Sequence, residues 1–427
     1  MLRGSSGLDR SSILDVTSYD VALDLTRGSD RFRSRSTVRF RCRQPGAGAF
    51  ADLHAASARR ATLNGADLDL LGGYRDGRLA LPRLAEDNVL VVDADFAYTS
   101  AAEGLHYATD PVDGSPFLFS KSSSGGASRI YCCFDQPDLR APFTISVRAP
   151  AGWTCLANAP ELKRPADGEH GIWRFAPTAP IPPWLTSLCA GVLPGQASGC
   201  QRDGGPPLPV TVRAVPSAAA FLEPLRVPEL LRQPLAYYER TLGVPYPYGK
   251  CDLVFGPVSP ALAYSVTGLI VIHDQVLRES HDDGTCLYPA LVIAHELAHA
   301  WFGGLVTLAR QDSWLDEALT TYISRTALAE TTLGTDPWTA LTSAALPDDY
   351  YAADAATVRQ LENIIGRPAV LNGLAALLQH HAHHDATKND LILHWSQASR
   401  QDLRHWAAET LMPAGRKEDP AQDENAR

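Results

Sequence analysis

The chain has 427 residues, of which 45% are apolar and 20% charged, and its formal net charge is −10. This balance is typical of a globular protein of roughly two or three domains, and the acidic charge argues against a nucleic-acid-binding protein, which would carry a basic face. There is no run of about 18 apolar residues, so we expect no membrane-spanning helix. The sequence begins without an apolar signal segment, and its eight cysteines form no CxxC pair. We therefore expect free thiols and a cytoplasmic protein.

The first part of the chain, about residues 15–195, is expected to form β-strands. Segments 19–25 and 36–42 alternate apolar and polar residues, which is the period of half-buried antiparallel strands. Turn signals such as Asn64-Gly65 and Asp76-Gly77 separate strands of this kind. We assign residues 1–195 to an N-terminal antiparallel β saddle or sandwich.

A Gly/Pro-rich polar stretch at 196–207 is interpreted as the domain boundary. After it the apolar period becomes helical, first at about 229–239 with an internal proline. Further helices are predicted at about 286–301, 313–330, 351–365 and 368–383. We assign residues 196–412 to a second, α/β domain and residues 413–427 to a polar tail without stable structure.

The strongest local motif is His295-Glu296-Leu297-Ala298-His299. Residues four apart lie on one face of a helix, so both imidazoles can reach one metal ion. Glu296 would then lie beside the metal, where a carboxylate can take a proton from water. The motif is short enough to occur by chance, and the alternative is a helix with two solvated histidines.

A second segment strengthens the metal interpretation. Gly303-Gly304 can end the first helix, and residues 314–323 begin another. Glu317 lies 18 residues after His299, so an antiparallel helix pair can return it to the metal. Two histidines and one glutamate leave a fourth position open for water, as in catalytic zinc sites. The sequence therefore predicts one Zn²⁺ per chain. Zinc is preferred to other metals because of the types of ligand, two imidazoles and one carboxylate.

At this point the chain resembles the aminopeptidase N family of zinc metallopeptidases, which also includes leukotriene hydrolase. The matching residues are His-Glu-Leu-Ala-His-Ala-Trp-Phe-Gly-Gly-Leu-Val at 295–306, Trp-Leu-Asp-Glu at 314–317 and Tyr-Cys-Cys-Phe-Asp-Gln-Pro at 131–137. The resemblance covers about residues 15–410 and implies a β saddle followed by a thermolysin-like catalytic domain. The loop 307–313 is one residue shorter than is usual in the family. The large helical domain that commonly follows in the family, where it covers the active site, has no counterpart in this sequence. We therefore expect either that the active site is more open or that a second subunit of a homo-oligomer covers it.

The resemblance also implies a tyrosine that stabilises the oxyanion of the tetrahedral intermediate. In the family it lies in a Tyr-x-Lys-Gly-Ala segment before a helix. Tyr351 begins the corresponding segment here, with the Lys and Gly lost, and Tyr350 is the second choice. The alternative is an aromatic residue that packs at the start of a helix.

The residues that hold a substrate's free amine in the family are replaced. The Glu of the family's Gly-Ala-Met-Glu-Asn loop falls on Ser265, next to Tyr264. The Gln and Glu of a second anchor fall on Lys121 and Ser123. A buried ammonium group would lose its carboxylate partners, at a cost of roughly several kcal/mol. We therefore predict weak activity on free-amine substrates and a preference for blocked-amine or acidic ones.

The predicted function is that of a zinc metallohydrolase that cleaves an amide or peptide bond of a specialised small molecule or peptide, for instance in secondary metabolism. Two alternatives remain open at this stage: an ordinary aminopeptidase on small peptides, and a zinc-binding scaffold or non-hydrolytic biosynthetic enzyme. The complete set of Glu296, Tyr351 and the three metal ligands argues against a scaffold.

Overall fold

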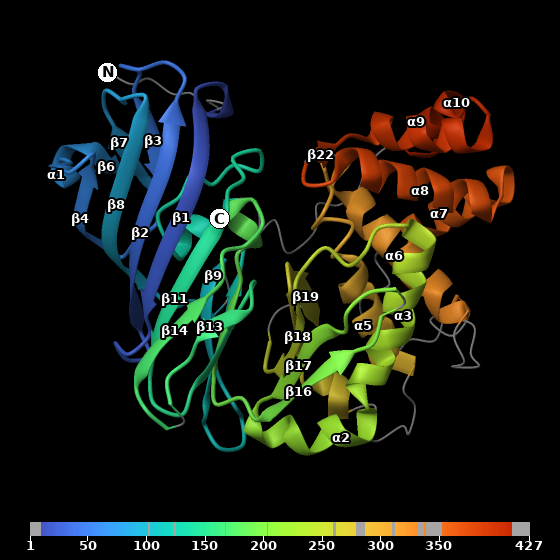
Figure 1. Cartoon of the computed structure of the whole chain (residues 1–427), viewed down its shortest axis with the longest axis horizontal. Coiled ribbons are helices and arrows are strands. Elements are labelled where there is room, and N and C mark those ends of the chain that lie inside the picture. Colours follow the sequence, from blue (N-terminus) through green and yellow to red (C-terminus); the bar gives the residue numbers. More distant parts are fainter. Residues whose placement is uncertain are drawn as a thin grey trace.

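The computed structural model describes residues 10–100, 103–122, 125–166, 168–202, 204–258, 262–278, 287–309, 312–330, 337–338 and 352–411. A β-rich N-terminal unit lies beside a C-terminal unit of sheet and helices (Figure 1). None of the helices in these ranges has the length and apolar character that crossing a bilayer requires. Seven cysteines fall within the same ranges, and each is a buried free thiol, as expected.

The largest sheet of the N-terminal unit has eight strands in the order β13-β14-β11-β1-β2-β8-β4-β5. Its long strands alternate buried and exposed side chains, as the period-2 pattern predicts. Neighbouring strands run antiparallel except β1 and β11, which run parallel. The strands are β1 Leu14–Asp24, β2 Arg31–Cys42, β4 Ser57–Leu63, β5 Ala66–Asp67, β8 Asp87–Ala97, β11 Phe143–Ala149, β13 Glu161–Lys163 and β14 Gly171–Phe175.

Two smaller sheets, β3-β7-β6 and β12-β15-β10-β9, share one apolar core with the large sheet. The rings of Tyr19 and Phe143 stack within that core, with centroids 4.3 Å apart. The remaining elements are β3 Ala49–Asp52, β6 Tyr74–Arg75, β7 Arg78–Leu81, β9 Gly104–Thr109, β10 Pro116–Lys121, β12 Thr154–Ala157, β15 Leu188–Gly191 and helix α1 Leu70–Gly73. The predicted multi-sheet N-terminal fold is confirmed.

The C-terminal unit contains a five-stranded sheet in the order β16-β17-β18-β20-β19. Its central strands run parallel, and β19 pairs antiparallel with β20 at one edge. The strands are β16 Gly195–Cys200, β17 Leu208–Ala214, β18 Cys251–Gly256, β19 Ala263–Val266 and β20 Leu269–His273. The stretch 196–207, interpreted as a linker, contributes strand β16 to this sheet because its residues pair with β17. The position of the domain boundary stays a prediction.

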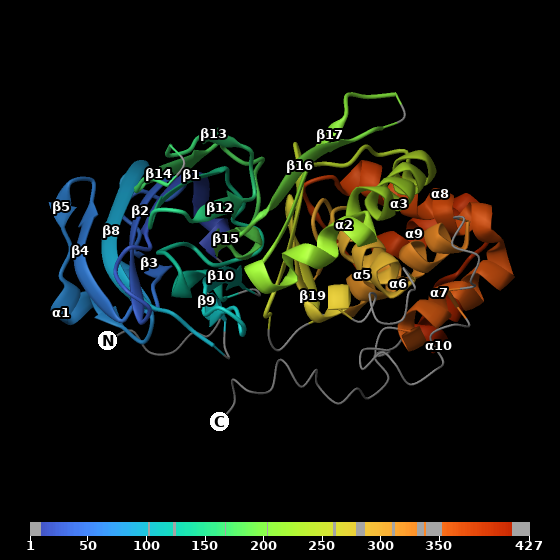
Figure 2. The same cartoon turned by 90° about the horizontal axis from the view of Figure 1, so that it is seen from below.

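Helices make up most of the rest of the C-terminal unit (Figure 2). They are α2 Leu222–Leu225, α3 Val227–Leu242, α5 Leu287–Ala298, α6 Trp314–Ala329, α7 Ala352–Ile365, α8 Arg367–His381, α9 Lys388–Ser399 and α10 Arg404–Thr410. Short 3₁₀ turns cover Arg10–Ser12, Ala127–Arg129, Pro183–Leu185 and Pro216–Phe221. The helices predicted near 229–239, 286–301, 313–330, 351–365 and 368–383 correspond to α3, α5, α6, α7 and α8, so the α/β character of this unit is confirmed.

The two units pack directly on each other through β10 and β18. The Phe117 ring of β10 lies so close to Gly256 of β18 that a Cβ atom at that glycine would be 2.7 Å from it. The buried Asn158 amide donates to the Thr267 carbonyl at 3.0 Å and to the Leu185 carbonyl at 2.8 Å. This close contact places the end of β10 near β19, the edge strand that flanks α5.

Candidate metal centre and active site

Helix α5 carries the first two predicted ligands. It is almost wholly buried, it carries His295 and Glu296 in its last turn, and His299 lies one residue past its end. The backbone N–H of His299 still reaches the His295 carbonyl, at 3.4 Å, so the helical geometry persists over the motif. Gly303 then reverses the chain with a φ of 91°, a conformation that favours glycine.

Helix α6 supplies the third ligand from its first turn, where Glu317 lies. The segment before it is held in place by a strand pairing and a hydrogen bond. Strand β21 Thr307–Leu308 pairs with β22 Asp385–Ala386, and the Leu308 N–H donates to the buried Asp316 carboxylate at 3.3 Å. The start of α6 thus lies beside the end of α5, although the sequence between them is one residue shorter than is usual in the family.

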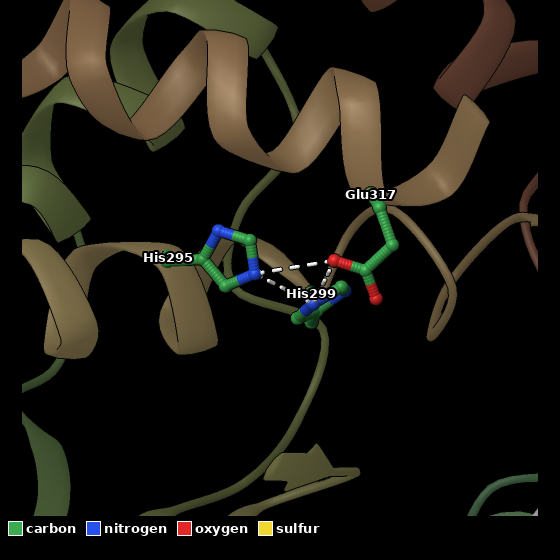
Figure 3. A group of neighbouring side chains, drawn as sticks. All are labelled: His295, His299 and Glu317. Atoms are coloured by element: carbon green, nitrogen blue, oxygen red, sulfur yellow. Dashed lines mark hydrogen bonds and ion pairs between the residues drawn. The ribbon is translucent and has the colours of Figure 1, made fainter. Parts of the chain in front are cut away.

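The three predicted ligands converge (Figure 3). His295 Nε2 lies 3.3 Å and His299 Nε2 3.5 Å from the same oxygen, Oε2 of Glu317. The two Nε2 atoms are 3.2 Å apart. The ligand atoms of these three side chains all lie within 4.8 Å of one another. Among the described residues, no other group of three or more His, Cys, Asp or Glu side chains is arranged in this way.

This donor set fits a divalent transition metal. Two imidazole nitrogens and one carboxylate oxygen are the ligands of a catalytic zinc site that keeps a fourth position open. The outer ring nitrogen of His299 lies 3.1 Å from the Phe302 carbonyl and 3.3 Å from the Thr320 hydroxyl. The outer nitrogen of His295 lies 3.4 Å from the Thr321 hydroxyl. Such contacts fix the ring orientation and leave each Nε2 lone pair directed at the metal position.

The electrostatics of the three side chains agree with this geometry. Burial opposes a charged imidazole, but the Glu317 carboxylate outweighs it and raises the pKa of His299 to about 10. Burial likewise opposes ionisation of Glu317, yet the imidazole of His299 holds the pKa of that carboxyl well below its usual range. The cluster thus stabilises a positive charge beside a carboxylate, which is the charge arrangement that a bound cation would take over.

Glu296 lies beside the ligands without being one of them. Its side chain is buried, and its Oε2 atom has no hydrogen-bond partner in the described structure. Burial raises the pKa of Glu296, while the nearby imidazoles and the Ser265 hydroxyl work in the opposite direction. A carboxylate with a raised pKa and a free oxygen is suited to accept a proton.

Strand β19 places Tyr264 and Ser265 next to Glu296. Both side-chain oxygens are buried and lack a hydrogen-bond partner among the described residues. Burial raises the pKa of Tyr264, and the Glu296 carboxylate adds to this effect. The predicted substrate-binding pair thus lies on the edge strand near Glu296, and its role in substrate binding stays a prediction.

Lys121 ends strand β10. Side chains at 117, 119 and 121 share one face of that strand, and the Phe117 and Phe119 rings belong to the core of the C-terminal unit. Phe119 also packs against Tyr264, with ring centroids 5.9 Å apart. The half-buried Lys121 is therefore on the strand face that is directed at the C-terminal unit. The predicted site residues Ser123, Tyr350 and Tyr351 lie outside the described residues.

The structure adds residues that the sequence analysis missed. Thr320 and Thr321 contact the two imidazoles from α6, and Asp316 is buried beside Glu317. Burial raises the pKa of Asp316 to about 8, although its hydrogen bond from Leu308 acts against this. The sequence spacing could have identified the two threonines, because residues three and four positions after Glu317 share its helix face.

Comparisons with known proteins agree with both units. Residues 16–185 match the model of the Peptidase M1 N-terminal domain, and residues 228–350 match that of the Peptidase family M1 domain. The chain is similar to the aminopeptidase N of Streptomyces lividans, with 33% identity over 95% of this chain and 51% of the relative. It is also similar to the probable aminopeptidase 1 of Sulfurisphaera tokodaii, with 30% identity over 53% of this chain and 28% of the relative. The chain thus spans at most about half the length of these relatives.

Proposed function

We propose that this chain, which belongs to the aminopeptidase N family of M1 metallopeptidases, hydrolyses peptide or amide bonds with one zinc ion bound by His295, His299 and Glu317. The observation that carries the proposal is the buried Glu296 carboxylate beside three convergent ligand atoms. A metal-binding scaffold would need the ligands but not an adjacent base.

When bound, zinc would polarise the substrate carbonyl and lower the pKa of water. Glu296 takes the proton from the attacking water, because its pKa is raised and its Oε2 atom is free. The same carboxyl then gives the proton to the leaving amine, which lets the C–N bond break. Thr320 and Thr321 keep the imidazoles oriented through this sequence.

Tyr351 is proposed as the donor that stabilises the oxyanion, with Tyr350 as the second choice. The support is its place in the sequence just before helix α7 Ala352–Ile365, which matches the segment that carries this tyrosine in the family. A phenol in that role lowers the barrier by hydrogen bonding the negative oxygen.

The proposed substrate class is blocked-amine or acidic peptides and amides. Ser265 stands where the family has an amine-binding Glu, and it contributes a hydroxyl group beside Glu296 in place of a negative charge. Lys121, and Ser123 in the same segment, replace the second anchor. A cation in the substrate site favours an anionic group of the substrate and disfavours an ammonium group.

An ordinary aminopeptidase is the second candidate, and the names of the relatives favour it. The comparisons offer no support for a specialised role in secondary metabolism or for a non-hydrolytic reaction. We propose a cytoplasmic location, because free thiols persist in a reducing compartment and the described cysteines are free and buried. Self-association into a homo-oligomer is a further proposal, and analytical ultracentrifugation would test it.

The testing experiment is a paired measurement on the purified protein. Metal analysis should give about one zinc per chain, and a panel of arylamides that differ only at the amine should be compared by kcat/KM. We expect the N-acylated and acidic members to be hydrolysed faster than the free-amine members. Faster turnover of the free-amine members would establish the second candidate, and zinc binding without any turnover would contradict both.

A further inference from the structure

A groove of about 480 Å³ lies where the N-terminal unit meets the edge of the five-stranded sheet that is remote from β19. Residues of strands β12, β13 and β14 line it on the N-terminal side, and residues of β16, β17 and β18 line it on the other. The predicted metal ligands lie at the end of α5 and in α6, and α5 contacts β19 at the opposite edge of the sheet. The groove is thus separate from the proposed active site, and its volume suits a small organic ligand.

Arg213 on β17 is the distinctive group in this groove. Its Nη1 atom donates to the Leu193 carbonyl at 2.6 Å, and its buried Nε atom has no acceptor among the described residues. Within the described chain no carboxylate lies within ion-pair distance of its guanidinium. The Asp252 and Glu161 carboxylates act on this cation only from beyond that distance. A partly buried cation without a direct ion-pair partner is costly, and a bound anion would offset that cost.

The other charged groups of the groove are already engaged. The buried Lys250 and Asp252 side chains form an ion pair with each other. Arg164 lies 3.9 Å from Glu161 at the exposed rim, and Glu169 adds another carboxylate there. The groove therefore has one uncommitted cation inside and carboxylates at its mouth. This arrangement suits a single negative charge better than a phosphate dianion.

The walls beside Arg213 are aromatic and apolar. They are lined by Trp153, Leu156, Trp173 and Phe175, of which the last three are buried. Trp153 is half-buried, so part of its ring remains available for contact. Rings of this size give large contact areas to an apolar or aromatic ligand.

We propose that this groove binds a small monocarboxylate that bears an apolar or aromatic group, with the carboxylate on Arg213 and the apolar group on Trp153. The guanidinium fork can donate two parallel hydrogen bonds to a carboxylate. The proposal does not depend on peptidase activity, since no residue of the groove belongs to the catalytic cluster.

The test is calorimetric titration of the zinc-loaded protein with 3-phenylpropionate, 3-phenylpropanol and inorganic phosphate. We expect the carboxylate to bind at least about tenfold more tightly than the alcohol or phosphate. Arg213→Gln should weaken its binding by about tenfold or more, while Arg148→Gln, a matched change at an exposed site on β11, should leave it unchanged. Trp153→Leu, which spares Arg213, should also weaken it, and circular dichroism would verify that each variant is folded.

Equal binding of 3-phenylpropionate to Arg213→Gln and the unaltered protein would overturn the proposal, because the carboxylate would then be held elsewhere, including at the zinc ion. The same holds if the alcohol or phosphate binds as tightly as the carboxylate, or if no binding is detected.

Discussion

Arg140 of the N-terminal unit and Asp385 of β22 form an ion pair of 2.5 Å. The Arg140 guanidinium also donates to the Thr307 hydroxyl of β21 at 3.2 Å. It thus binds both strands of the small β21–β22 sheet, whose first strand lies between α5 and α6 in the sequence. Because β21 immediately precedes α6, the N-terminal unit helps to fix the position from which Glu317 approaches the metal site.

Replacing Arg140 by alanine should therefore destabilise the protein. The side chain is only 10% exposed, and its loss removes the cation paired with Asp385 and one hydrogen bond to Thr307. We expect the free energy of unfolding, measured by urea denaturation, to fall by about 1–3 kcal/mol. Arg404→Ala is the control, because that arginine forms an exposed pair with Asp402 and should contribute nothing measurable. Equal effects of the two substitutions would mean that Arg140 has no special role.

The sequence alone predicted the three side chains that converge and most of the helices, because these depend on local periodicity. Helical spacing placed His295 and His299 on one face of a helix. Gly303 and Gly304 indicated the end of that helix, so that a second helix could bring Glu317 back to the histidines. The pairing of β21 with β22 could not be predicted this way, since residues 307 and 385 are far apart in sequence and each strand has two residues. Strand β16 was also missed, because an edge strand rich in Gly and polar residues has the composition of a loop.

The surroundings of the ligands were the less predictable part of the site. The uncharged β19 residues were inferred by position from a family resemblance, and their contact with Glu296 emerges only when β19 packs beside α5. Arg213 has no motif around it. Arg213 stands out only in the folded structure, where the nearby Asp252 and Glu161 carboxylates pair with Lys250 and Arg164.

Glu317→Gln should abolish the stabilisation that zinc provides. A ligand that binds only the folded state raises the free energy of unfolding by about 3 kcal/mol at a concentration about 100-fold above its dissociation constant. We expect this rise for the unaltered protein in thermal or urea unfolding with added zinc, and a much smaller rise for Glu317→Gln. The exposed substitution Glu330→Gln should keep the full effect. Undiminished zinc stabilisation of Glu317→Gln would contradict its role as a ligand.

Glu296→Gln should separate metal binding from catalysis. The amide cannot take a proton from water, so kcat/KM on a substrate that the unaltered enzyme hydrolyses should fall by about 10²–10⁴-fold. Zinc content should stay at about one per chain, since Glu296 is not one of the converging ligands. Glu229→Gln on the exposed face of α3 provides a matched change that should preserve activity. Retained activity in Glu296→Gln would require a different base.

Asp135 should make the stability of the N-terminal unit depend on pH. Burial raises the pKa of this carboxyl from 3.8 to about 6, even though the N–H groups of Ser128 and Gly125 donate to it. The folded state therefore binds the proton more tightly than the unfolded state. The resulting stabilisation is complete below the unfolded pKa of 3.8 and is lost as the pH rises through about 6.

Asp135→Asn removes this titration but keeps only one of the two oxygens that accept from Gly125 and Ser128. The cost of the lost acceptor is the same at every pH, so the pH dependence of the difference reports the carboxyl group. Relative to the unaltered protein, the variant should gain up to about 3 kcal/mol in free energy of unfolding between about pH 4 and pH 8, from about 1.36 kcal/mol per pKa unit. Urea unfolding of the zinc-free proteins would measure it, since zinc release at low pH would otherwise add its own pH dependence. Asp138→Asn serves as the exposed control. If the advantage of Asp135→Asn were the same at both pH values, the Asp135 carboxyl would have to titrate alike in the folded and unfolded states.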